Sequence, residues 1–304
     1  MNRRELIRAG LVAGVAGAAL SACGADKDGR YGGIGHGERK KLLKGFSVNL
    51  EMWWTELPLE QRFELAALAG FTQVEIWFVS SANLNANELA KMAKAAGVKV
   101  TQIVGASSKL GAPYGRDIFL TSMKSAIEEA KILGAPVVTI TGHEIIENQS
   151  NELSIENYRH NLEAAAPLFE EAKIFAAVEP FNPYDHPGHF INGHKDALNM
   201  VRVIGSDYVK INWDLFHMQR AEGNVIASLR EGIDQVCYMQ LADSPGRNQP
   251  GTGEMDYVNI ISAARAAGYT GPIGLECVPK DNNNDQAVID MLVLSERVAA
   301  AAQV

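Results

Sequence analysis

The sequence predicts a (β/α)8 barrel, and three observations lead to this fold class. From Phe46 onward, short apolar segments alternate with amphipathic ones about every 30 residues, which is typical of strand–helix units in a parallel sheet. Eight such units follow one another. The last four predicted strands end in polar side chains, and a closed barrel brings such strand ends around one mouth. A doubly wound open sheet is the structural alternative.

The elements follow in order along the chain. The predicted strands are apolar segments bounded by polar or turn residues, and they cover 46–51, 72–78, 99–104, 136–141, 174–179, 209–214, 236–243 and 272–277. The predicted helices cover 59–69, 87–96, 117–133, 155–173, 195–204, 224–232, 257–267 and 285–301. Gly97 and Gly134 are expected to end the second and third helices, and Ser154 to cap the fourth.

Residues 1–22 predict a signal peptide. Arg3 and Arg4 begin a basic segment that resembles a twin-arginine signal, although the export route stays open. The apolar segment that follows is too short to span a bilayer, which takes about 20 residues. Leu20-Ser21-Ala22-Cys23 matches a bacterial lipobox, so Cys23 is the expected lipidation site; a cleaved signal with an incidental cysteine is the alternative. We therefore expect an exported periplasmic or cell-surface lipoprotein that meets a membrane only through this lipid.

Residues 23–44 are polar and rich in glycine, which predicts a flexible tether, and 45–304 form the expected catalytic barrel. The net charge of −8 argues against a partner bound through nucleic acid phosphates. Cys237 and Cys277 fall in predicted buried strands and are expected to be core residues, not a disulfide or a zinc site. A homo-oligomer is left open.

Polar side chains end the fifth to eighth predicted strands, and they are Glu179, Asp214, Gln240 and Glu276. A carboxylate at the end of a buried strand needs a cation or hydrogen-bond donors, because an isolated charge is costly to bury. Three carboxylates and one amide make an all-oxygen set, which suits one Mg²⁺ or Mn²⁺ better than zinc. The alternative is that each side chain caps a helix or pairs with a surface lysine.

Three further side chains are candidate substrate contacts at this mouth. His217 follows Asp214 by one helical turn and can donate a hydrogen bond to a substrate oxygen, while His143 follows the fourth strand at the same rim. Arg247 is the best-placed cation for a carboxylate or phosphate, since a guanidinium offers two donors to an oxyanion. Gly251-Thr252-Gly253 lacks the lysine of a P-loop and does not indicate a nucleotide site.

Two glutamates beside one cation indicate proton-transfer chemistry. With the cation holding a carbonyl and a neighbouring hydroxyl oxygen, one glutamate removes the proton from the carbon between them, giving an enediolate, and the proton returns to the neighbouring carbon. Glu179 and Glu276 lie on non-adjacent strands and can face a substrate from opposite sides, so they are the expected acid/base pair. The expected partner is a small hydroxy-carbonyl compound or sugar, as for an aldose–ketose isomerase or epimerase.

These motifs resemble those of a known superfamily. Val178-Glu179-Pro180-Phe181-Asn182 and Trp213-Asp214-Leu215-Phe216-His217 are similar to the xylose-isomerase-like barrels. The segments 240–247, 250–254 and 274–276 narrow the resemblance to the hydroxypyruvate isomerase branch. The resemblance implies one Mg²⁺ or Mn²⁺ on Glu179, Asp214, Gln240 and Glu276, with Glu179 and Glu276 as acid/base pair and His217 and Arg247 as substrate contacts. It also implies the conversion of hydroxypyruvate to tartronate semialdehyde.

Two departures keep alternatives open. Strand eight reads Glu276-Cys277-Val278-Pro279-Lys280, without the lysine that the branch commonly has before the proline. The export signal suits a substrate other than cytoplasmic hydroxypyruvate, so an exported sugar epimerase, or a keto-sugar isomerase or lyase, is the alternative enzyme. A non-catalytic sugar-binding lipoprotein is the alternative from another class. A DNA repair endonuclease of the superfamily would need more histidine ligands and a basic face.

Overall fold

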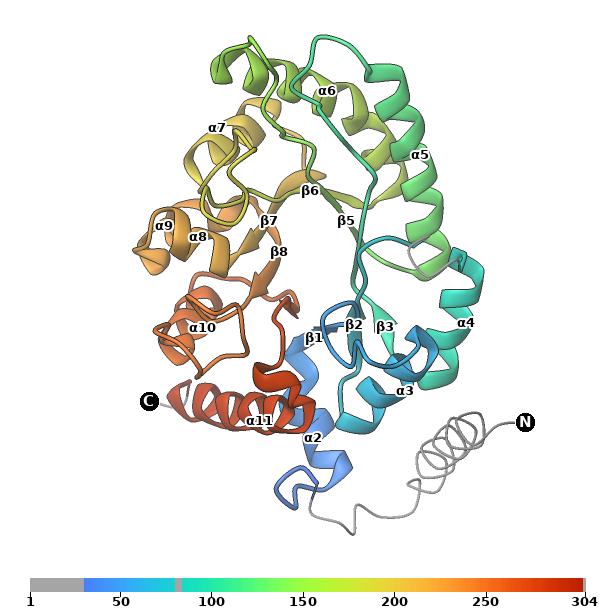
Figure 1. Cartoon of the computed structure of the whole chain (residues 1–304), viewed down its shortest axis with the longest axis vertical. Helices are drawn as coiled ribbons and strands as arrows, with labels where there is room; N and C mark the ends of the chain where they lie inside the picture. Colours follow the sequence, from blue (N-terminus) through green and yellow to red (C-terminus); the bar gives the residue numbers. More distant parts are fainter. Residues whose placement is uncertain (1–29, 80–83, 303–304) are drawn as a thin grey trace, which may run out of the picture.

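The computed structural model describes residues 30–79 and 84–302, and in this part of the chain parallel strands form a barrel inside a ring of helices (Figure 1). The strand order is β3-β2-β1-β9-β8-β7-β6-β5-β4. β3 (Lys99–Val100) and β4 (Gln102–Val104) are two halves of the third predicted strand. The Val104 amide donates to the Trp77 carbonyl at 2.7 Å, which joins the two ends of the sheet. The predicted barrel is therefore confirmed.

Every predicted strand is present, mostly shortened by a residue or two at its ends. The remaining strands are β1 (Phe46–Asn49), β2 (Gln73–Glu75), β5 (Val137–Ile140), β6 (Phe175–Val178), β7 (Val209–Asp214), β8 (Val236–Leu241) and β9 (Ile273–Leu275). Most of their residues are buried, because helices cover the outside of the parallel sheet and side chains fill the inside. In the register of β7 and β8, Asp214 lies opposite Gln240, so these side chains end their strands at one level.

The eight predicted helices are present, and one further helix follows β7. They are α3 (Leu59–Ala69), α4 (Ala86–Ala96), α5 (Arg116–Leu133), α6 (Asn151–Ala172), α7 (Lys195–Ile204), α8 (Leu215–Ala221), α9 (Val225–Gly232), α10 (Tyr257–Ala266) and α11 (Asn284–Ala301). Ser150 caps α6, not Ser154, because the Ser150 hydroxyl accepts from the Leu153 amide while Ser154 lies buried inside the helix. The unpredicted helix α8 begins at once after Asp214, whose carboxylate accepts from the Phe216 amide.

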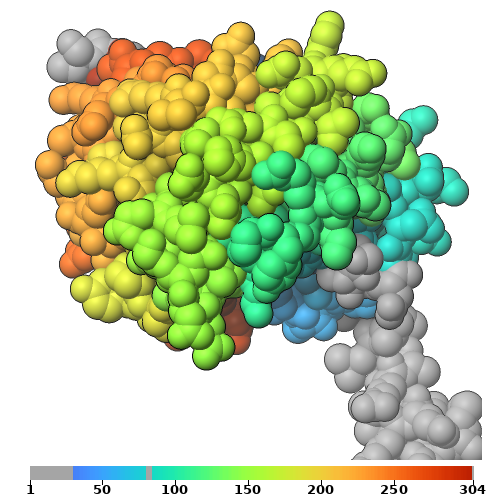
Figure 2. Space-filling model, turned by 90° about the horizontal axis from the view of Figure 1, so that it is seen from above, coloured from blue at the N-terminus to red at the C-terminus, as the bar shows by residue number. Residues whose placement is uncertain are grey.

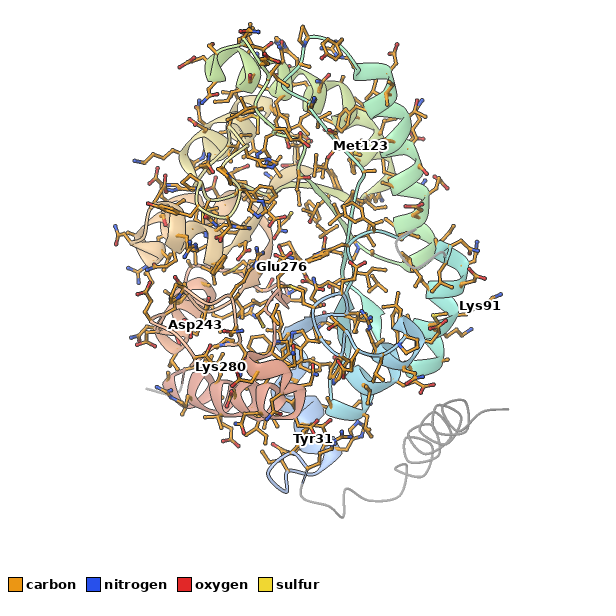
Figure 3. All side chains as sticks on the ribbon, in the orientation of Figure 1. Tyr31, Lys91, Met123, Asp243, Glu276 and Lys280 are labelled. Carbon is orange, nitrogen blue, oxygen red and sulfur yellow. The ribbon has the colours of Figure 1, made fainter. Side chains whose placement is uncertain are left out.

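The prediction of a flexible tether is wrong for residues 30–44, which pack against the barrel. α2 (His36–Leu42) and the 3-10 turn η1 (Leu43–Gly45) lie beside α11 and α3 (Figure 1). Arg39 is buried, and its guanidinium donates to the carbonyls of Ile34, Leu68 and Ala69. It also lies 4.7 Å from the ring centre of Tyr31, which Figure 3 labels at this edge. One buried arginine and one tyrosine anchor this segment. Its polar composition predicted a tether because such a composition does not indicate packing against a core.

The loops at the carboxyl ends of β4 and β5 lie against one another. The Leu110 amide donates to the Gly142 carbonyl, and the Asn161 side chain on α6 donates to the Leu110 carbonyl, both at 2.8 Å. In Figure 2, which shows the molecule from the side of α5 and α6, the green segment before α5 lies beside the yellow-green start of α6. A hollow of about 520 Å³ is lined here by 112–118, Asn157 and Asn161, outside the barrel interior.

The predicted signal peptide 1–22 and Cys23 lie outside the described residues, so cleavage, lipidation and export stay predictions. Among the helices that the structure describes, none has both the length and the apolar character needed to cross a bilayer. Cys237 and Cys277 are free thiols, and Cys277 is buried, as predicted.

Candidate active site and metal centre

The four predicted ligands lie at the carboxyl ends of four neighbouring strands. Glu179 follows β6, Asp214 ends β7, Gln240 lies near the end of β8, and Glu276 follows β9. All four side chains are buried. Figure 3, which looks along the barrel, labels Glu276 near its middle, and active sites of this fold lie at the mouth formed by the carboxyl ends of the strands. The barrel thus brings together residues that are far apart in the sequence.

Arg247 joins two of the carboxylates. Its Nη2 lies 3.2 Å from Asp214 Oδ2 and 3.0 Å from Glu276 Oε2. The indole Nε1 of Trp77 donates to the other oxygen of Glu276 at 2.9 Å. The guanidinium carbon lies 5.0 Å from the ring centre of Phe216, which supports the cation from one side. Arg247 Nε has no hydrogen-bond partner among the described residues, so its N–H is left for a ligand.

Burial raises the pKa of every carboxyl group in this cluster. Burial is the main cause for Glu179, and with the nearby charge of Asp214 it raises the pKa to about 8. The pKa of Glu276 is raised well above its ordinary value by burial and then by Glu179. Burial also raises the pKa of Asp214, although Arg247 opposes it. One guanidinium does not balance three carboxylates, so full ionisation requires a further cation.

His217 lies beside two of the carboxylates, and its predicted role as a substrate contact stays a prediction. Its Nε2 is 3.5 Å from Asp214 Oδ2 and 3.7 Å from Glu179 Oε1, and it has no hydrogen-bond partner in the described chain. These three side chains bring one atom each within 4.8 Å of one another, which is close enough to surround a metal ion. Burial and then the charge of Arg247 lower the pKa of His217 well below its ordinary value, so the ring is neutral.

Gln240 joins a buried hydrogen-bond network instead of the carboxylate cluster. Its Oε1 accepts from Asn212 at 2.5 Å, and its Nε2 donates to Glu75 at 3.1 Å. Glu75 also accepts from Asn49 and Tyr238, and burial raises its pKa to about 7. Sequence reasoning missed Glu75 because the second strand was predicted to continue to residue 78, whereas β2 ends at Glu75.

His143 is bound to the main chain beside Glu179 and to a second histidine. It is fully buried, its Nε2 lies 2.9 Å from the Glu179 carbonyl oxygen, and its Nδ1 lies 3.3 Å from His189 Nδ1. Because a carbonyl can only accept, Nε2 donates and Nδ1 accepts from His189. Burial and the nearby His189 lower the pKa of His143 to about 3. With both nitrogens engaged, His143 does not offer the substrate contact that the sequence predicts.

The loop that carries Arg247 is built around the buried Asp243. Asp243 Oδ2 accepts from three main-chain amides, those of Gly251, Thr252 and Gly253, and its Oδ1 accepts from the Met255 amide. The Arg247 amide in turn donates to the Asp243 carbonyl at 2.9 Å. Residues 251–253 therefore bind a carboxylate of this chain, and their sequence alone carried no signal of this role.

Gly253→Ala is expected to destabilise this loop. A Cβ at Gly253 would lie 2.1 Å from the Ser244 carbonyl oxygen and 2.6 Å from Asp243 Oδ1, so the main chain must shift. Such overpacking costs about 1–3 kcal/mol of unfolding free energy, measurable as a lower midpoint in urea. The control is Gly37→Ala in α2, where no atom lies within 4 Å of the added carbon and the midpoint should not fall. Equal midpoints for both variants would show that the loop tolerates the shift.

The fold and site define a class of protein: a parallel barrel enzyme with buried carboxylates and an imidazole at the carboxyl ends of its strands. The chain belongs to the xylose isomerase-like TIM barrel family, whose model matches residues 63–297. Its similarity to named relatives extends over most of the barrel.

Two curated relatives are isomerases by name. Hydroxypyruvate isomerase of Escherichia coli is 29% identical over 243 residues, 77% of this chain and 93% of the relative. The 2-oxo-tetronate isomerase of Haemophilus influenzae is 31% identical over 249 residues, with coverage of 77% and 93%. The predicted resemblance to the hydroxypyruvate isomerase branch, and with it the prediction of an isomerase-type enzyme, is confirmed.

Solved structures support the same fold. An AP endonuclease of family 2 from Brucella melitensis has a TM-score of 0.76 and 24% identity, over 80% of this chain and 96% of that one. The 3-keto-D-glucoside 4-epimerase of E. coli has a TM-score of 0.69 and 21% identity, over 83% and 98%. At these identities, the comparison concerns the fold alone.

Proposed function

We propose that this protein is a divalent-metal-dependent isomerase of a small hydroxy-carbonyl compound, with hydroxypyruvate to tartronate semialdehyde as the first candidate reaction. The observation that carries the proposal is the convergence of Glu179, Asp214 and Glu276 on one buried mouth beside His217 and Arg247. The relatives named hydroxypyruvate isomerase and 2-oxo-tetronate isomerase support the substrate class.

The residues fit a hard divalent cation. Three carboxyl groups share one guanidinium, and the pKa values of Glu179, Asp214 and Glu276 are raised mainly by burial, with Arg247 opposing the rise. These three would hold Mg²⁺ or Mn²⁺, and Gln240 is the proposed fourth ligand, provided that its carboxamide turns away from Asn212. A cation bound there would supply a Lewis acid beside the substrate oxygens.

The side chains of this chain account for binding and proton transfer. Arg247 Nε, which has no partner among the described residues, is proposed to donate to the substrate carboxylate. One glutamate of the pair Glu179 and Glu276 takes the proton from C3 of hydroxypyruvate, and the C–H electrons form the enediolate. A proton is then delivered to C2, and the C3 hydroxyl proton passes to the oxygen on C2, which gives the isomeric aldehyde with no net gain or loss of atoms. β7 and β8 lie between the strands that carry the two glutamates. This separation supports the proposal that the glutamates reach the substrate from opposite sides.

Lys280 does not supply the lysine that the branch commonly has on strand eight. It begins the 3-10 turn η3 (Lys280–Asn282), its side chain is exposed, and Figure 3 labels it near α11, away from the central Glu276. This departure keeps an exported sugar epimerase, or a keto-sugar isomerase or lyase, as the alternative. We also propose that Cys23 is lipidated and that the protein is exported. The Leu20–Cys23 motif alone supports this part of the proposal.

The test is a substrate screen of the chain that lacks only residues 1–22, supplied with Mn²⁺. Hydroxypyruvate, tartronate semialdehyde, 2-oxo-tetronate and common ketoses are incubated separately, and products are identified by chromatography and mass spectrometry. We expect interconversion of hydroxypyruvate and tartronate semialdehyde. Turnover of a ketose without turnover of hydroxypyruvate would overturn the narrow assignment. Binding of a sugar without any turnover would support a non-catalytic lipoprotein.

A further inference from the structure

We propose that Asn182 is a positioning residue that holds His217 in the tautomer with its proton on Nε2. His217 then acts as a hydrogen-bond donor to substrate and is excluded from the metal coordination sphere. The tautomer follows from the hydrogen bonds alone, whereas its catalytic use rests on the proposed function.

The main chain fixes the orientation of the Asn182 carboxamide. Its Oδ1 lies 3.0 Å from the amide nitrogens of both Tyr184 and Asp185. Main-chain amides can only donate, so the side-chain atom that faces them must be the oxygen. The NH₂ group therefore faces the other way. Asn182 is fully buried, which leaves no solvent to satisfy a reversed carboxamide.

The NH₂ group of Asn182 meets two acceptors. Nδ2 lies 2.8 Å from Asp185 Oδ2 and 2.7 Å from His217 Nδ1. Since Nδ2 donates, His217 Nδ1 must accept and carries no proton. A proton on that nitrogen would face the hydrogens of the NH₂ group. The one proton of the neutral ring is therefore on Nε2.

The protonated Nε2 points at the carboxylates. It lies between Asp214 Oδ2 and Glu179 Oε1, at 3.5 and 3.7 Å, beyond normal hydrogen-bond distance. A nitrogen that carries a proton has no lone pair for a cation, although its distance from the two carboxylates matches a metal site. The rings of Phe181 and His186 lie 5.1 and 5.2 Å from the imidazole and flank it.

A buried donor without a partner beside two carboxylates suits a substrate oxygen that gains negative charge when the neighbouring carbon loses its proton. Because His217 is excluded from the metal coordination sphere, only oxygen ligands remain for the cation. Such a set favours Mg²⁺ or Mn²⁺, whereas a free imidazole nitrogen would favour zinc. Asn182 thus links the loop after β6 to both substrate binding and the choice of metal.

The double variant Asn182→Asp/Asp185→Asn reverses the polarity at His217 with no change in net charge. The carboxylate at 182 can still accept from the two main-chain amides and from the new side-chain amide at 185. The oxygen that faces residue 185 also faces His217 and accepts a hydrogen bond from Nδ1–H, which leaves Nε2 without a proton. The matched control is Asp185→Asn alone, which also removes the 2.8 Å contact between Arg220 and Asp185 but keeps Asn182.

The measurement is ¹H–¹⁵N NMR of the histidine side chains in protein labelled with [¹⁵N]histidine, with His217 assigned from its loss in His217→Gln. We expect the Nε2–H pattern in the wild type and in the control, and the Nδ1–H pattern in the double variant. Zinc affinity relative to magnesium affinity, measured by competition, should rise at least about tenfold in the double variant alone.

The wild-type spectrum is decisive even when the double variant does not fold. If the wild type has its proton on Nδ1, the inference about Asn182 is wrong. The inference is also wrong if a folded double variant keeps the wild-type tautomer. Neither result bears on the proposed isomerase activity. Conversely, an Nε2–H tautomer in a protein without isomerase activity would overturn the proposed function and leave the role of Asn182 intact.

Discussion

Glu276→Gln and Glu179→Gln are each expected to lower kcat by about 10²–10⁴-fold and to suppress hydrogen exchange between substrate and solvent. Glutamine keeps the shape and one oxygen of the side chain but cannot take up a proton. Both glutamates are buried at the mouth, and Glu276 is held by Trp77 and Arg247. The measurement is the deuterium content of substrate and product after incubation in D₂O at saturating Mg²⁺.

The matched control is Glu60→Gln at the exposed start of α3, which removes a carboxylate far from the mouth and should retain wild-type exchange. If either buried variant retained wild-type exchange, that glutamate could not be an obligatory proton carrier. Unequal losses of hydrogen exchange would also show which glutamate acts first, because the glutamate that takes the first proton governs exchange out of the substrate.

Removal of the divalent cation is expected to abolish turnover and to lower the thermal midpoint. The three carboxyl groups at the mouth have raised pKa values because burial and mutual repulsion disfavour their ionised forms. A bound cation relieves both effects, and at a concentration about 100 times its Kd it adds about 2.7 kcal/mol to the unfolding free energy. Activity and thermal unfolding are measured after chelation and after Mn²⁺ is restored.

The control for the metal experiment compares two aspartates. Asp214→Asn removes a proposed ligand and should lose the Mn²⁺-dependent rise in midpoint, whereas Asp117→Asn, at the exposed start of α5, should keep it. Full activity in the chelated wild type, or an unchanged Mn²⁺ response in Asp214→Asn, would contradict a metal centre at this mouth.

The barrel could be predicted because its determinants are local. Apolar strands, amphipathic helices and terminal glycines such as Gly97 and Gly134 each depend on a few neighbouring residues. α2 was missed because a buried arginine, and not an apolar face, anchors it against the carboxyl end of α3. α8 was missed because it is short and begins directly at the end of β7.

The candidate site was predictable to the level of strand ends and no further. Glu179, Asp214 and Glu276 lie at one mouth because parallel strands share their direction. Which way a side chain turns depends on contacts between distant segments. The pairing of Gln240 with Glu75, of His143 with His189, and of Asn182 with His217 therefore could not be derived from the sequence.

The central claim is that Glu179, Asp214 and Glu276 converge on one divalent cation. The most direct test is anomalous X-ray scattering from crystals grown with Mn²⁺. One strong anomalous peak is expected among these three carboxylates, at ordinary Mn–oxygen distances and without a bond to His217 Nε2. The absence of a peak at the mouth in crystals that contain Mn²⁺, or a single peak elsewhere on the molecule, would contradict the claim.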